Sequence, residues 1–169
     1  QKPGQRAGVL LLIMNKTHQI AQIIAALEHD LDVVTRAAQS AYEAATAEEN
    51  IAENKYDTLG LEASYLATGQ ARRSAEIRQA LQTYRQLKLR DYDPEQGVQV
   101  SQVVTLEDEQ GQCRRLIIGP EAAGLKIVLG DEVVMVITPR SPLGQQLMGK
   151  RIDEEVSLNA TGWTLVEVI

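Results

Sequence analysis

The sequence contains no phenylalanine and a single tryptophan, and aromatic residues make up 4% of its 169 positions. A large core or ligand pocket lined by aromatic side chains is therefore not expected. Positive charge is also scarce, because 17 lysines and arginines stand against 23 aspartates and glutamates, a net charge of −6. This balance disfavours a protein that binds nucleic acid simply by gripping its phosphates.

Cysteine and histidine are almost absent. Cys113 is the only cysteine, so the chain can form no internal disulfide and no zinc cluster. A reducing compartment, most simply the cytoplasm, is therefore expected. His18 and His29 have no second ligand at metal-binding spacing and are interpreted as surface residues. No glycine-rich phosphate loop, nucleophile elbow or Ser/His/Asp set is recognisable, which disfavours a self-contained enzyme with a small-molecule substrate.

Long apolar runs are missing as well. Val9–Met14 is too short to span a bilayer and makes a poor signal-peptide core, so no membrane association is expected. Met14 is a candidate for the biological start, which would make residues 1–13 an upstream extension. The alternative is an N-terminal arm, residues 1–15, whose apolar part packs on a neighbour.

Two heptad patterns dominate residues 16–90. In the first, apolar residues recur at alternating steps of four and three, the pattern of a coiled-coil seam, and Asn15 or Thr17 can cap its start. Because a short turn joins the two segments, the sequence predicts an antiparallel hairpin; a bundle segment or an intermolecular coil is the alternative. The seam positions are Ile20, Ile24, Leu27, Leu31, Val34, Ala38, Ala41 and Ala45, then Tyr56, Leu59, Ala63, Leu66, Gln70, Arg73, Ile77, Ala80, Tyr84 and Leu87.

Charge is sorted along this predicted rod. Residues 43–62 hold six carboxylates against Lys55 alone, whereas residues 72–90 hold six cations against Glu76 alone. A solvated helix face usually mixes its signs, so this segregation favours a partner of complementary charge. The acidic tip lies near residues 48–57. The basic side chains include Arg72, Arg73 and Arg78.

The tip carboxylates have two interpretations. Asn50 and Glu53 have the spacing of a capping box, in which the Asn side chain accepts from the new helix and Glu53 reaches back. Glu53 and Asp57 lie four residues apart and share a helix face, with Glu49 just before the turn. Such a set could complete a Mg²⁺ site of which a partner supplies the other half.

The pattern changes after residues 91–97, which contain Pro94 and Gly97 and are predicted to be a linker. Beyond the linker, Ser141 and Pro142 are typical of the start of a short helix, which Gly149 ends. The fold class is therefore predicted as α+β, a helical hairpin followed by a small antiparallel β domain over residues 98–169. Its strands are predicted at residues 98–106, Cys113–Ile118, Leu125–Leu129, Glu132–Ile137, Val156–Asn159 and Trp163–Val168.

The order of these parts, with two motifs, resembles the bacterial Gre transcript-cleavage factors from about residue 16 onward. Gre tips carry an acidic residue, two others and then Glu-Asn; here the stretch is Asn50-Ile51-Ala52-Glu53-Asn54. Gre C-terminal domains carry Ser-Pro, a short helix and Leu-x-Gly-Lys. The corresponding stretch is Ser141-Pro142-Leu143-Gly144-Gln145-Gln146-Leu147-Met148-Gly149-Lys150, the more specific of the two matches.

This resemblance implies an FKBP-like C-terminal domain that docks on RNA polymerase, with Ser141, Pro142 and Lys150 as docking residues. It also implies a coil that enters the secondary channel of the polymerase. There the tip helps to bind a Mg²⁺ that belongs to the polymerase active site, and the polymerase hydrolyses the 3′ end of backtracked RNA. The factor would be no enzyme and would hold no cofactor of its own. By charge and place, Arg72, Arg73 and Arg78 are candidate contacts to the RNA or the channel.

One departure matters for the chemistry. Glu53 matches the Glu of the tip motif, but the family's other acid is Asn50 here, and a neutral amide is a poorer Mg²⁺ ligand. Glu49 and Asp57 are the candidates to take its place. The alternatives are a non-cleaving homologue that blocks the channel or alters pausing, a prolyl isomerase suggested by the implied fold, and a coiled-coil adaptor.

Overall fold

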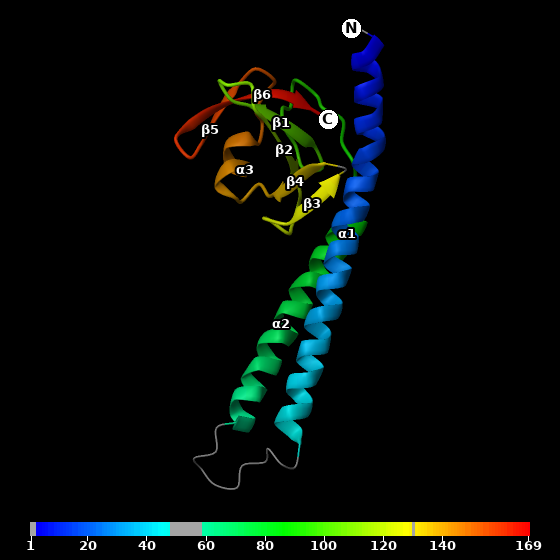
Figure 1. Cartoon of the computed structure of the whole chain (residues 1–169), viewed down its shortest axis with the longest axis vertical. Helices are drawn as coiled ribbons and strands as arrows, with labels where there is room; N and C mark the ends of the chain where they lie inside the picture. The colour runs from blue at the N-terminus through cyan, green and yellow to red at the C-terminus, as the bar shows by residue number, and fades with distance from the viewer. Residues whose placement is uncertain (1–2, 48–58, 130) are drawn as a thin grey trace. The chain divides into compact units, whose positions relative to one another are not determined.

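Residues 3–47, 59–129 and 131–169 are described by the computed structural model of this chain (Figure 1). They fall into two compact units. We call Ile24–Gln82 the hairpin unit, and Gln1–Ile23 with Thr83–Ile169 the sheet unit. No described helix is long and apolar enough to cross a membrane.

Two long helices are found where the heptad patterns predict them. α1 spans Pro3–Thr46 and α2 spans Leu59–Arg85. The first helix starts earlier than expected, since it is continuous through Asn15 and Thr17, so neither residue caps it. Proline is well tolerated in the first turn of a helix, where its missing N–H has no intrahelical acceptor, which explains a start at Pro3.

The seam of the hairpin unit follows the prediction in α1 but shifts in α2. Leu27, Ala41 and Ile77 are buried as expected. Leu66 was expected in the seam and is 57% exposed, whereas Ser74 is only 4% exposed. Arg73, also expected there, has a side chain that is 58% exposed and pairs with Glu76 at 3.5 Å. A small serine inside and a solvated arginine outside avoid the cost of burying a charge.

The sheet unit contains one six-stranded sheet in the order β3-β4-β2-β1-β6-β5. The strands are β1 Val103–Glu107, β2 Cys113–Ile118, β3 Lys126–Leu129, β4 Glu132–Ile137, β5 Glu155–Leu158 and β6 Thr161–Val168. Neighbouring strands are antiparallel except β2 and β4, which are parallel. The sheet is therefore mixed, and the predicted all-antiparallel domain is corrected on this point. The chain reverses direction twice between β2 and β4, so the two strands run the same way when β4 lies beside β2.

A short helix covers part of one face of this sheet (Figure 1). α3 spans Pro142–Leu147, with Ser141 at its N-cap and proline in its first turn, as predicted. Leu143 and Leu147 belong to a core cluster with Val156 and Leu165 from β5 and β6. The same cluster extends across β1 and β2 and includes Val98 of the segment before the sheet.

The outer edge of β5 is closed by a side chain of α3. The Gln146 amide nitrogen donates to the Ser157 carbonyl, and the Ser157 N–H donates to the Gln146 oxygen, both at 2.9 Å. One glutamine thus pairs with both backbone groups of an edge residue, as a further strand would do.

Within the sheet unit, one residue of each long helix is hydrogen-bonded to a segment outside the helices and strands. The Tyr84 hydroxyl donates to the Glu121 carbonyl at 2.6 Å, and the Lys16 ammonium donates to the Arg90 carbonyl at 2.7 Å. The segment around Arg90 is held from its other side, because the Arg90 N–H donates to the Ser101 hydroxyl at 2.8 Å. Both tie residues are buried, so these hydrogen bonds are shielded from competing water.

Burial of Lys16 predicts a pH-dependent stability. Desolvation lowers the pKa of Lys16 from its ordinary 10.5, and the Asp91 carboxylate opposes this only in part. The unfolded chain therefore binds this proton more tightly, and the free energy of unfolding should rise as the pH rises toward 10.5. In Lys16→Met this contribution should vanish, giving a smaller slope in urea titrations between about pH 7 and pH 10.

The exposed Lys88 provides the matched control, since Lys88→Met should keep the slope of the wild type. Equal slopes in all three proteins would contradict a lowered pKa of Lys16 in the folded chain. The upper limit of about pH 10 matters because burial raises the pKa of Tyr84. That shift stabilises the fold below the ordinary tyrosine pKa, and its contribution is lost as the pH rises further.

Candidate functional site

The predicted tip residues fall in the segment that joins α1 to α2. Glu49, Asn50, Glu53 and Asp57 lie within residues 48–58, outside the described part of the chain. Their roles as metal-assisting carboxylates and as a helix cap therefore stay predictions. In the sequence, this segment follows α1 and precedes α2, the two helices of the hairpin unit. At 1.5 Å per residue, the 27 residues of α2 span about 40 Å.

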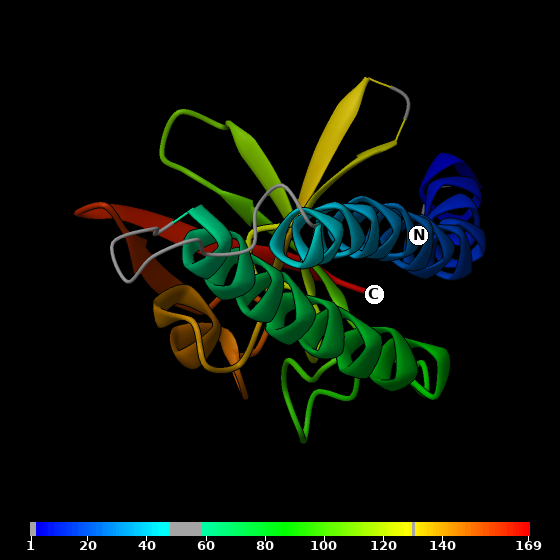
Figure 2. The same cartoon turned by 90° about the horizontal axis from the view of Figure 1, so that it is seen from below.

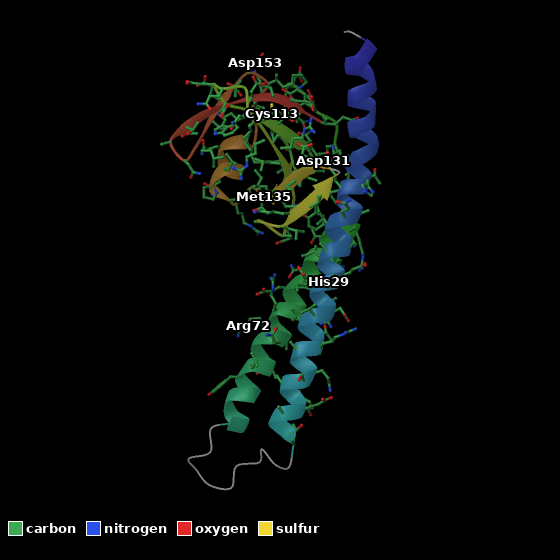
Figure 3. The ribbon with its side chains drawn as sticks, in the orientation of Figure 1. His29, Arg72, Cys113, Asp131, Met135 and Asp153 are labelled. Atoms are coloured by element: carbon green, nitrogen blue, oxygen red, sulfur yellow. The ribbon has the colours of Figure 1, made fainter. Side chains whose placement is uncertain are left out.

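The three arginines proposed as contacts all lie exposed on α2, and Figure 3 labels Arg72 there. A helix turns by about 100° per residue, so Arg72 and Arg73 point about 100° apart. Arg78 lies about 120° from Arg72 and about 140° from Arg73. The helix therefore spreads the three charges around its exposed surface and does not gather them on one face. They can attract an anionic partner but do not form a single binding patch.

Arg78 differs from the other two because it lines a groove on one flank of the hairpin unit. The groove has a volume of about 330 Å³ and is floored by small residues. Tyr42, 59% exposed, also lines it. The full lining is Thr35, Ala38, Gln39 and Tyr42 from α1 and Ala67, Ala71, Ser74 and Arg78 from α2. Of these lining residues only Ala38 belongs to the predicted seam.

The Ser-Pro motif that carried the resemblance is largely explained by local structure. The Ser141 hydroxyl accepts from the Gly144 N–H at 3.2 Å and donates to the Thr138 carbonyl at 2.7 Å. Its hydrogen-bonding groups are thus used within α3 and the turn before it. Pro142, at the first turn of α3, is exposed. Of this pair, Pro142 is the residue that a partner could reach.

The Gly149-Lys150 end of the same motif is hydrogen-bonded to the start of the β domain. The Val98 N–H donates to the Lys150 carbonyl at 2.9 Å, and the Gly149 N–H donates to the Val98 carbonyl at 3.0 Å. Gly97 and Gly149 both have positive φ, at 71° and 80°, and their backbones lie in close contact. The motif therefore serves to join residues 97–98 to the end of α3, and its Lys150 side chain is half-buried.

The described His, Cys, Asp and Glu side chains are dispersed. Among residues 3–47, 59–129 and 131–169, no three His, Cys, Asp or Glu side chains come together as metal ligands would. Cys113 is exposed near the Glu107 carboxylate, with 3.9 Å between its sulfur and the nearer oxygen. His18 is exposed and hydrogen-bonds Gln22 at 2.9 Å, and His29 is exposed on α1 (Figure 3), as predicted for both histidines.

Sequence reasoning missed one surface feature. Val128 of β3 and Val133 of β4 are 60% and 53% exposed, although both belong to strands of apolar character. The strand pattern shows apolar residues on both faces of this hairpin and gives no sign of which face is left uncovered. Only the position of α3 on the sheet decides that.

Comparison with known proteins gives one family match. Residues 93–169 match the family model described as transcription elongation factor, GreA/GreB, C-terminal. No curated protein sequence matches the chain.

Three of the solved structures that resemble this chain are described here by their likeness to it. The GreA factor homolog 1 (Gfh1) of Thermus thermophilus is 19% identical, with 86% of this chain and 94% of that chain covered at a TM-score of 0.36. Gfh1 of Thermus aquaticus is 19% identical, covering 92% and 94% at a TM-score of 0.35. A GreA/GreB factor of Nitrosomonas europaea is 16% identical, covering 54% and 78% at a TM-score of 0.31.

Proposed function

We propose that this chain is a Gre-like regulator of transcription elongation that binds bacterial RNA polymerase. The reason is that residues 93–169 match the family model of the GreA/GreB C-terminal domain. The family match of the β domain is the observation that carries the proposal. It is supported by the helical hairpin that precedes this domain and by the acidic segment that joins the two helices. In this proposal the chain is a factor that acts on the polymerase and not an enzyme itself.

The proposed mechanism uses the hairpin as a probe. A two-helix rod about 40 Å long is narrow enough to enter the secondary channel of the polymerase. Its tip would bring the Glu53 carboxylate to the active site, where it would help to hold a Mg²⁺ supplied by the polymerase. In two-metal hydrolysis the ions activate a water and stabilise the developing charge on the RNA phosphate. Asn50 would cap the start of the helical turn that carries Glu53 and so keep this carboxylate in place.

A second candidate is favoured by Asn50 itself. The family's tip acid is absent at this position, and an amide neither carries charge nor helps to deprotonate a water. A tip with one carboxylate fewer could occupy the channel without promoting hydrolysis. The chain would then block the channel or change pausing, through the same docking and the same hairpin.

One experiment tests both candidates. Purified bacterial RNA polymerase stalled on a backtracked transcript is incubated with the full chain, and binding, transcript length and pause lifetime are measured. Stimulated cleavage appears as shortened transcripts and supports the first candidate. Binding with unchanged transcript length and altered pausing supports the second. If the chain neither binds polymerase nor alters cleavage or pausing, the proposed function is wrong.

A further inference from the structure

A hollow of about 470 Å³ lies within the sheet unit, on the segment that links α2 to β1. This segment, residues 86–102, precedes the sheet and is drawn as a green tube in Figure 2. A hollow of this size, with apolar side chains and a few polar groups in its lining, is typical of small-molecule sites. The lining includes Gln86, Leu87, Lys88 and Arg90 from the first part of the segment and Gln99 and Val100 from its last part.

Two fully buried polar side chains hold these two parts together. The Gln102 oxygen accepts from the Gln99 N–H at 2.8 Å, and the Gln102 amide nitrogen donates to the Asp91 carbonyl at 3.0 Å. The Ser101 hydroxyl accepts from the Arg90 N–H at 2.8 Å. Gln102 and Ser101 are both 0% exposed, so water does not compete for these bonds. The two parts of the lining are therefore fixed relative to each other before a ligand arrives.

The backbone is strained at one of these two residues. Ser101 has φ of +83°, a left-handed conformation that is uncommon for residues other than glycine. Glycine would adopt it more easily but has no hydroxyl to accept from the Arg90 N–H. Backbone strain of this kind clusters at binding and catalytic sites, and here it occurs at a residue that positions Arg90.

Positive charge gathers at this hollow. Lys88 and Arg90 are exposed, and neither has an ion-pair partner among the described residues. The described lining contains no aspartate or glutamate, although carboxylates outnumber cations by 23 to 17 in the whole chain. The Asp91 carboxylate, next to Arg90 in the sequence, is not part of the lining either. Two unpaired cations that share one hollow attract an anion.

We propose that this hollow binds a small phosphate ester with a non-aromatic body, whose phosphate is held by Lys88 and Arg90. A phosphate monoester carries a charge of about −1.5 to −2 at pH 7, which matches two cations, whereas a single carboxylate carries one negative charge. The Arg90 guanidinium can donate two parallel hydrogen bonds to the phosphate oxygens, and the Lys88 ammonium adds a point charge.

The rest of the lining determines the body of the ligand. Leu87 and Val100 offer apolar contact, and the side-chain amides of Gln86 and Gln99 can pair with hydroxyl groups. Among the described lining residues there is no aromatic side chain on which a nucleobase could stack. A sugar phosphate is the simplest molecule that combines these features. The proposed site does not depend on binding to polymerase.

Calorimetric titration of the full chain with ribose 5-phosphate at low ionic strength tests this site. Lys88→Gln and Arg90→Gln should each raise Kd by about tenfold or more, because each removes one charged partner of the phosphate. Lys126→Gln, at an exposed cation outside the lining, should leave Kd unchanged. Inorganic phosphate should bind about tenfold more weakly than the ester, since it lacks the body. The ester should also raise the melting temperature of the wild type.

Several outcomes would overturn the proposal. One is the absence of heat and of a melting shift up to about 10 mM ester, where a millimolar site would be mostly filled. Equal Kd in wild type, Lys88→Gln and Arg90→Gln would place the ester elsewhere. Succinate or inorganic phosphate binding as tightly as the ester would mean that any anion is accepted, and tighter binding of AMP would contradict the non-aromatic body.

Nucleic acid is the remaining occupant to separate. If a single-stranded RNA oligomer binds through Lys88 and Arg90 while ribose 5-phosphate does not bind, the two cations serve RNA and the proposal is wrong. Each of these results leaves the proposed function standing, because that function is measured with stalled polymerase in the absence of the ester.

Discussion

Glu53→Ala should reduce stimulated transcript cleavage by at least about 10- to 100-fold while polymerase binding is unchanged. The proposed contribution of Glu53 is one carboxylate oxygen to a Mg²⁺ held mainly by the polymerase, and alanine removes that ligand. Binding should persist because it is assigned to the β domain, far along the chain from the tip. The measurement is the cleavage rate of a stalled complex at saturating factor, together with Kd for the same polymerase.

The matched control exploits the neutral cap. Aspartate caps helices about as well as asparagine, so Asn50→Asp changes the charge at the tip and preserves the cap. If the tip assists hydrolysis, this variant should cleave faster than wild type, since it regains the second acid of the family motif. Glu49→Gln and Asp57→Asn show whether either carboxylate already does that work. Full cleavage activity in Glu53→Ala would rule out Glu53 as the ligand donor.

Gly97→Ala should destabilise the fold by about 3 kcal/mol or more. Gly97 has φ of +71°, and a Cβ there would lie within 2.8 Å of the Gly149 Cα and closer still to its carbonyl. Backbone on both sides would have to move, and with it the hydrogen bonds that tie Val98 to Gly149 and Lys150. Urea denaturation followed by circular dichroism measures the loss of unfolding free energy.

Gly111→Ala is the control that isolates the clash. Gly111 has φ of +80°, but a Cβ there would meet nothing within 4 Å. Its substitution should therefore cost only the left-handed backbone strain, about 1–2 kcal/mol. Equal losses in the two variants would mean that the close approach of Gly97 and Gly149 does not contribute to stability.

Much of the fold could be predicted from the local pattern of apolar residues and from the turn and helix-cap residues between the elements. The bounds of β2 and β4, Cys113–Ile118 and Glu132–Ile137, agree with the prediction, because a glycine turn or loop marks their ends. The cap at Ser141 was also predicted correctly, since cap and first-turn proline are chemical requirements of a helix start. The β1 strand is shorter than predicted, because Ser101, with φ of +83°, interrupts the extended chain before Val103.

The remaining errors concern properties that no short stretch of sequence determines. The parallel pairing of β2 with β4 depends on which strand of a hairpin lies inward, and strand alternation is the same either way. The shifted seam of α2 depends on how closely α1 approaches, which favours Ser74 over Arg73 at a buried position. The candidate site divides in the same way. Family motifs identify Glu53 and the Ser141–Lys150 stretch, but the exposure of Val128 and Val133 follows from where α3 stops.

The two hydrogen bonds between the Gln146 amide and the Ser157 backbone also affect how molecules of this chain can associate in a crowded solution. Without that amide, β5 would offer free backbone groups at the rim of a six-stranded sheet, where another chain could add a strand. Strand addition of this kind can repeat from molecule to molecule and lead to open-ended fibres. A single side chain on a six-residue helix therefore protects the edge strand β5 from the addition of strands of other molecules.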